Sequence, residues 1–85
     1  MNVALLVPRG TPLVTERHGL VRTQVRAALW RVTQPAGAVV GYIERVDEGA
    51  VERFRVKRLG RDFRTFVALG DYDSFEDAFD GLRRS

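Results

Sequence analysis

The stretch DYDSFEDAFDGLRR, residues 71–84, decides the fold because it describes one amphipathic helix. Apolar side chains recur along it at the i, i+3, i+4 and i+7 spacing of one helical face, namely Phe75, Ala78, Phe79 and Leu82. Ser74 is placed to cap the first turn, and Asp77 follows three residues later in a capping-box-like pattern. Glu76 suits the N-terminal end of the helix dipole, and Arg83 and Arg84 suit its C-terminal end. The sequence therefore predicts a helix with one face against a core.

Upstream of this helix, apolar and polar side chains alternate between turn-forming residues, as is typical of strands joined by hairpins. The predicted strands are LWRVT (29–33), AVVGYIERV (38–46), ERFRVK (52–57) and FRTFVALG (63–70). QPAG (34–37), DEGA (47–50) and LGRD (59–62) supply the turns. Gly41 inside a strand indicates a bulge or a close approach by a neighbouring backbone. The fold class is therefore α+β: a small antiparallel β-meander of three to four strands with the C-terminal helix packed on one face.

The first thirty residues are less clear. GLVRTQVRAAL, residues 19–29, fits both a helical stripe and the alternation of a strand, and we prefer a strand that runs into Trp30. Residues 1–19, which contain Pro8 and Pro12, are predicted to be flexible or ordered only by a partner. Residues 20–85 then form a single small α+β domain. Its predicted core consists of Trp30, Val32, Phe54, Val56, Phe79 and Leu82.

Composition limits the chemistry that the chain can carry. Its 85 residues contain no cysteine and one histidine, His18, which has no Asp or Ser near it in an expected turn. The acids after Asp71 begin like a calcium loop, but Phe75 and Leu82 occupy positions that require ligands. We therefore predict no enzymatic activity, no cofactor and no metal site.

Two further features bear on localisation. The longest apolar runs, such as residues 3–7, are too short to span a bilayer, and the N-terminus lacks the layout of a signal peptide. The absence of cysteine is compatible with a reducing compartment. Together these features predict a cytoplasmic protein without a membrane partner.

Basic residues concentrate in the predicted sheet, although the net charge is only +3. From residue 52 to 64 six bases accompany two acids, whereas from residue 71 onward five acids accompany two arginines. In RFRVKR, residues 53–58, alternation turns apolar side chains inward and cations outward. The candidate nucleic-acid-binding residues of this face and its neighbouring strands are Arg31, Arg45, Arg53, Arg55, Lys57 and Arg64.

Two functions of a non-enzymatic binding module fit this pattern. A stripe of cations on a sheet would attract the phosphates of nucleic acid and release their counterions. The same pattern also arises without any ligand, because an antiparallel sheet with one solvent-exposed face alternates apolar and charged residues, and Glu44 and Glu52 are placed to pair with the arginines. The alternative binding function is contact with a protein partner, or with a second copy of the chain that joins the basic sheet to the acidic helix.

From Trp30 onward the chain resembles a group of short actinobacterial proteins, through WRV, GYIER, RFRVKR and FVALGDYDSFEDA. They share a Trp-x-Val start, a Gly-Tyr-Ile-Glu strand, a basic strand and a Ser-capped helix. The order of a small meander followed by a helix is also similar to the arm-type DNA-binding domains of phage integrases. That similarity implies a basic sheet laid in the major groove of DNA.

Overall fold

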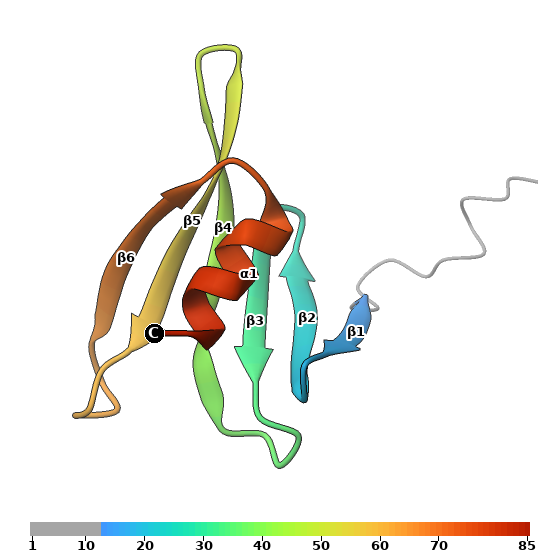
Figure 1. Ribbon diagram of the computed structural model, residues 1–85, viewed down its shortest axis with the longest axis vertical. Helices are drawn as coiled ribbons and strands as arrows, with labels where there is room; N and C mark the ends of the chain where they lie inside the picture. Colours follow the sequence, from blue (N-terminus) through green and yellow to red (C-terminus); the bar gives the residue numbers. More distant parts are fainter. Residues whose placement is uncertain (1–12) are drawn as a thin grey trace, which may run out of the picture.

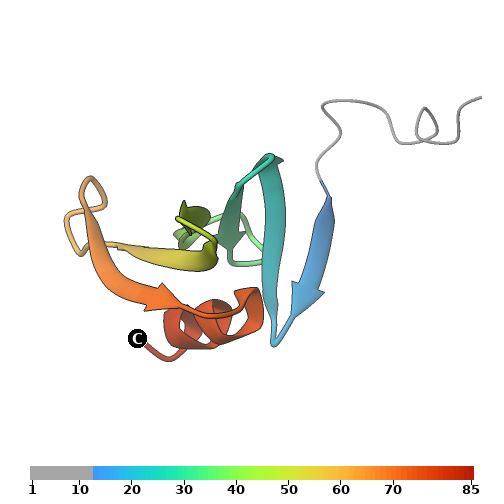
Figure 2. The same ribbon diagram turned by 90° about the horizontal axis from the view of Figure 1, so that it is seen from above.

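The computed structural model describes residues 13–85, which form one sheet and one helix (Figure 1). The six antiparallel strands lie in the sheet in their order along the chain. The elements are β1 (Val14–Arg17), β2 (Leu20–Arg26), β3 (Leu29–Thr33), β4 (Val39–Glu48), β5 (Val51–Leu59), β6 (Phe66–Tyr72) and α1 (Phe75–Arg83). Figure 2 shows the sheet bending around α1. We call the side of the sheet against the helix the inner face and the opposite side the outer face.

The α+β meander with its C-terminal helix is confirmed, but three to four strands were too few. Residues 20–29 form neither a helix nor one continuous strand, because the chain turns at Ala27 and Ala28 between β2 and β3. β1 lies within residues 1–19, and the chain reverses after it at His18 and Gly19, whose φ angles are 52° and 77°. All four side chains of β1 are exposed, so its sequence shows no alternation of buried and exposed residues from which a strand could be predicted. Residues 1–12 of the predicted N-terminal segment lie outside the described residues.

The last strand begins later than predicted, at Phe66 instead of Phe63. The carboxylate of Asp62 accepts hydrogen bonds from the backbone amides of Arg64 at 2.9 Å and Thr65 at 3.0 Å. The bond from Thr65, followed by that from Arg64, holds the pKa of Asp62 below its usual value. This Asp-centred turn keeps residues 63–65 out of the strand and leaves Phe63 80% exposed with a φ of 58°.

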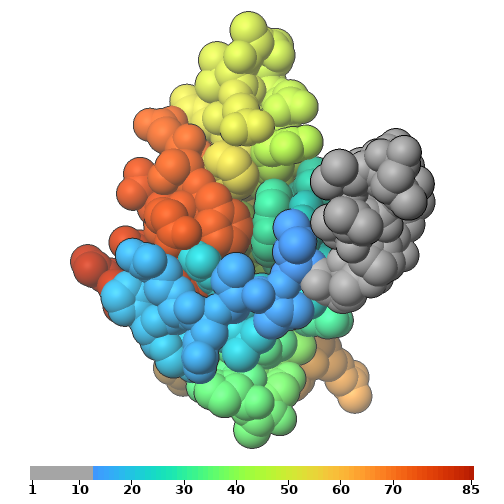
Figure 3. Space-filling model, turned by 90° about the vertical axis from the view of Figure 1, so that its right-hand side faces the viewer, coloured from blue at the N-terminus to red at the C-terminus, as the bar shows by residue number. Residues whose placement is uncertain are grey.

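Two predicted turns are confirmed. Gly49 lies in the two-residue turn between β4 and β5 and has a φ of 65°. Glycine tolerates the left-handed backbone that such a turn needs. The amide of Gln34 donates a hydrogen bond to the carbonyl of Ala38 at 2.8 Å and closes the turn between β3 and β4. The tip of the β4–β5 hairpin projects beyond the rest of the sheet (Figure 1, Figure 3).

The C-terminal helix is confirmed in place and in capping. Ser74 precedes it in an extended conformation, and its hydroxyl accepts a hydrogen bond from the amide of Asp77 at 3.1 Å. Glu76 and Asp77 lie in the first turn and Arg83 in the last, as the helix dipole favours.

No helix within residues 13–85 has the length and apolar composition needed to cross a membrane.

The core lies between α1 and the central strands. Its buried residues are Val32, Ile43, Phe54, Val56, Ala78, Phe79 and Leu82. Five of the six predicted core residues are buried, and Trp30 is partly buried against them, with its ring centroid 5.0 Å from that of Phe75. Phe79 is fully buried, and burial of such a side chain contributes about 1.5–3 kcal/mol.

Gly41 in β4 lies close to the backbone of β5 and to the side chain of Leu82 in the helix. A Cβ at this position would overlap the backbone oxygen of Lys57 and lie 3.0 Å from Cδ1 of Leu82. The pairing of β3 with β4 slips beside it, since Gly41 faces Val32 while Val39 faces Thr33. Both the bulge and the close approach that the sequence indicated are present.

One cation of β2 is buried on the inner face. Arg22 is 9% exposed, and its Nη1 donates to both carboxylate oxygens of Glu76 in α1, at 2.8 and 2.9 Å. Its Nε donates to Oγ1 of Thr15 in β1 at 3.0 Å. Its guanidinium carbon lies 5.0 and 4.8 Å from the ring centroids of Phe75 and Phe79. Arg22 therefore joins β1, β2 and the helix.

Candidate nucleic-acid interface

The strand register determines which side chains share the outer face. Val56 is buried under α1, and the residues next to it along β5 point to the opposite side. Its neighbour Lys57 is paired with Tyr42, which is paired in turn with Arg31. The outer face of the central strands therefore carries Arg31, Tyr42, Glu44, Arg53, Arg55 and Lys57.

The outer face holds four of the six candidate cations, Arg31, Arg53, Arg55 and Lys57. Arg45 was expected beside them, but it is paired with the buried Phe54 and so lies on the inner side. Arg64 was expected on a neighbouring strand, but it lies in the loop before β6. Arg45 follows the buried Ile43 by two residues and so shares its face, and the turn at Asp62 keeps Arg64 out of β6; these two placements were wrong.

Carboxylates neutralise two of the outer-face cations. Nη1 of Arg53 lies 2.7 Å from Oδ1 of Asp73. Arg55 donates to both carboxylate oxygens of Asp71, at 3.0 and 3.2 Å. The hydrogen bond from Arg55 lowers the pKa of Asp71, and the same bond raises the pKa of Arg55, so both groups stay charged. These two arginines therefore offer little uncompensated charge to a phosphate.

Three further cations on the outer side of the sheet form no ion pair with a carboxylate of the described residues. Within residues 13–85 the ion pairs join Arg17 and Arg22 to Glu76, Arg45 to Glu52, Arg53 to Asp73, Arg55 to Asp71 and Arg83 to Asp80. Arg26, Arg31 and Lys57 take part in none of them. The uncompensated charge of the outer face thus lies toward β2, β3 and the second half of β5.

A hollow of about 320 Å³ opens on this face. It is lined by Arg26, Leu29, Tyr42, Glu44, Arg55, Lys57 and Phe66. The rings of Tyr42 and Phe66 meet edge to face with centroids 5.3 Å apart, and Phe66 is 43% exposed. We call this site the outer-face hollow. It combines two aromatic rings with two free cations, Arg26 and Lys57, and one carboxylate, that of Glu44.

Five of the residues that line the outer-face hollow were missing from the sequence candidates, namely Arg26, Leu29, Tyr42, Glu44 and Phe66. Tyr42 could have been found, because alternation along its strand places it opposite the core. Phe66 could not, because the strand was expected to begin at Phe63. Arg26 reaches the hollow through a slip in the pairing of β2 with β3, for which the sequence has no signal.

Within residues 13–85 no group of three or more His, Cys, Asp or Glu side chains is placed to hold a metal ion. Comparisons with protein-family models, with curated proteins and with solved structures found no match to the chain.

Proposed function

We propose that this protein is a small binding module that holds single-stranded nucleic acid on the outer face of its sheet. The observation that carries the proposal is the outer-face hollow, where Tyr42 and Phe66 lie beside Arg26 and Lys57. Aromatic rings stack on unpaired bases of any sequence, and cations follow the phosphate backbone. A base would stack on the exposed ring of Phe66, beside Tyr42, while its flanking phosphates approach the cations. Arg31 extends the charge along β3.

The arrangement favours single strands over duplex. A grip on duplex DNA through phosphates alone depends on the number of cations that neutralise them. Arg53 and Arg55 are already paired with Asp73 and Asp71, so few cations remain for that purpose. In a single strand the base faces are accessible, and stacking adds about 1–3 kcal/mol per base. Stacking would therefore compensate for the small number of free cations.

A protein partner or a second copy of the chain is less favoured. Such a partner would join the basic sheet to the acidic helix. Glu76 is already held by Arg22 within the same chain, and Asp80 is held by Arg83. These internal ion pairs remove much of the charge difference on which association would depend.

Binding of labelled oligonucleotides, followed by fluorescence anisotropy over a range of salt concentrations, tests the proposal. Tyr42→Ala should weaken single-strand binding by about 1–3 kcal/mol through lost stacking. Lys57→Gln should reduce the slope of log K against log salt by about 0.7, the value for one phosphate contact on a single strand. Arg45→Gln removes the same charge from the inner side and serves as the matched control, with no expected effect.

Three results would contradict the proposal. The first is that the parent protein shows no affinity for single-stranded DNA or RNA in low salt. The second is that duplex binds as tightly as single strands and Tyr42→Ala has no effect, which would indicate phosphate contact alone. Finally, Arg45→Gln could weaken binding as much as Lys57→Gln, which would indicate attraction by net charge instead of by this surface. Melting temperatures of all variants, measured in parallel, separate loss of binding from loss of folding.

A further inference from the structure

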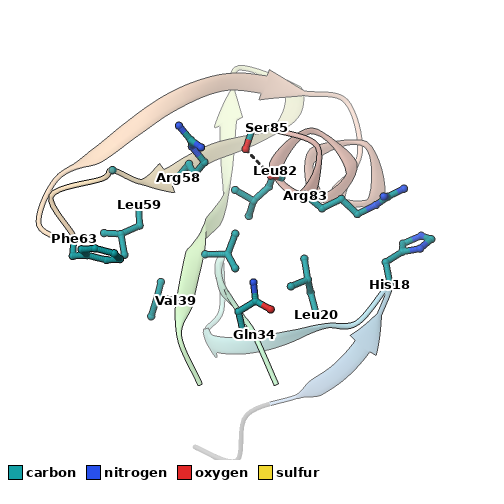
Figure 4. A pocket seen from close by; sticks show the side chains of 12 residues that line it. His18, Leu20, Gln34, Val39, Arg58, Leu59, Phe63, Leu82, Arg83 and Ser85 are labelled. Carbon is teal, nitrogen blue, oxygen red and sulfur yellow. Dashed lines mark hydrogen bonds between the residues drawn. The ribbon is translucent and has the colours of Figure 1, made fainter. Parts of the chain in front are cut away.

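A second hollow, of about 490 Å³, opens beyond the last turn of α1, where Leu82 meets the inner face (Figure 4). It lies between that turn, the β1–β2 turn, the start of β4 and the loop that follows β5. Its volume falls within the range of pockets that bind small molecules. We call it the helix-end hollow. It lies across the sheet from the outer-face hollow, so a ligand here would not depend on nucleic-acid binding.

One side of the helix-end hollow is apolar. The aliphatic and aromatic side chains that line it include Leu20, Val39, Leu59, Phe63 and Leu82. Figure 4 shows Phe63 and Leu59 together at one end of the hollow, with Val39 beside them. Phe63 is 80% exposed, and a ligand that covers it would remove apolar surface from water.

The polar side of the hollow is basic. Arg58, Arg83 and His18 line it, and none of the described lining residues is an Asp or a Glu. Arg83 is paired with Asp80 at 3.0 Å, whereas Arg58 takes part in no ion pair within residues 13–85. Nε of Arg58 is buried and has no hydrogen-bond partner among the described residues. The positive charge of Arg58 is therefore not compensated by a carboxylate of the described residues.

The end of the helix acts against an anion, because its last carbonyls carry partial negative charge. Two of these carbonyls already accept hydrogen bonds. The hydroxyl of Ser85 donates to the carbonyl of Leu82 at 2.6 Å, and the amide of Arg84 donates to that of Asp80 at 3.1 Å. The full charge of Arg58 therefore outweighs the remaining partial charge of a helix of nine residues.

We infer that the helix-end hollow binds a small organic acid with an apolar body, such as a medium-chain carboxylate. The carboxylate pairs with the guanidinium of Arg58, the lining arginine that has no carboxylate partner among the described residues. The chain of the ligand lies along Leu59, Phe63 and Val39. Charge selects the anion, and the apolar wall selects the length of its chain.

Titration of the isotope-labelled protein with octanoate, followed by amide chemical shifts in NMR spectra, tests this inference. The amides of residues that line the helix-end hollow should shift, and those of the outer face should not. Within the series from acetate to octanoate, affinity should rise by up to about fourfold for each added methylene group until the hollow is filled. Octylamine, with the same chain and the opposite charge, should not bind.

Charge variants locate the carboxylate. Arg58→Gln should weaken octanoate binding by about tenfold or more, since it removes a charge-assisted hydrogen bond. Arg61→Gln, an equal change of charge at an exposed residue that does not line the hollow, should leave it unchanged. Phe63→Ala, at an exposed loop position where folding is not at risk, should reduce the gain in affinity with chain length. Equal binding of octanoate and octylamine, no binding of octanoate, or equal effects of the two arginine variants would overturn the inference.

Discussion

The contact between Arg22 and Glu76 gives the sharpest test of how the helix is attached to the first strands. Glu76→Gln keeps the size of the side chain and one acceptor oxygen but removes its charge, which leaves the guanidinium of Arg22 with neutral hydrogen-bond acceptors, the Gln amide oxygen and Oγ1 of Thr15. The side chain of Arg22 is 10% exposed and that of Glu76 is 53% exposed. The pair is therefore neither a surface ion pair nor a fully buried one.

The expected cost follows from this intermediate burial. A surface pair contributes about 0–1 kcal/mol, and breaking a fully buried pair costs about 3–5 kcal/mol. Because water still reaches Glu76 but hardly reaches Arg22, we expect Glu76→Gln to lower the free energy of unfolding by about 1–2 kcal/mol. For a domain of this size each kcal/mol corresponds to about 4–8 °C in melting temperature.

Urea denaturation of four proteins measures this contact: the parent, Glu76→Gln, Arg22→Met and the double variant. Arg22→Met keeps an unbranched apolar stem against Phe75 and Phe79, so the cycle isolates the coupling between the two charges. Asp77→Asn is the matched control, since Asp77 lies in the same helical turn but forms no ion pair in the described chain. A coupling energy below about 0.3 kcal/mol, within the error of additivity, would refute the reasoning. So would a loss in Glu76→Gln no larger than that in Asp77→Asn.

Three further predictions concern stability. Phe79→Ala should lower the free energy of unfolding by about 3–5 kcal/mol, since Phe79 is fully buried; a loss below about 1 kcal/mol in denaturant would show that the helix does not pack there. Gly41→Ala should cost about 1–3 kcal/mol or more, because its Cβ would overlap the backbone of Lys57; an unchanged melting temperature would contradict this. Arg55 holds the pKa of Asp71 below its usual value, so their interaction stabilises the fold above about pH 4 and is lost as the pH falls through the lowered pKa. Asp71→Asn should therefore make the melting temperature less sensitive to pH below about pH 4, and an acid dependence equal to that of the parent would disprove it.

The sequence by itself determined the features that depend on neighbours along the chain. The cap at Ser74 and the apolar face of α1 involve residues three or four positions apart, so their spacing is visible directly. Alternation in β3 and β5 identified Val32, Phe54 and Val56 as core residues because each strand buries one face. The hairpin turn at Gly49 could also be predicted, because the residues that form it are neighbours in the sequence.

Only the tertiary structure decided the features that depend on pairing between distant segments. The exposed strand β1 forms because its backbone pairs with β2, and the pattern of its own side chains does not predict that pairing. The outer-face hollow depends on a slip between β2 and β3 that brings Arg26 toward Tyr42. A shift of one residue in register exchanges the two faces of a strand, and register is set by contacts across the whole sheet.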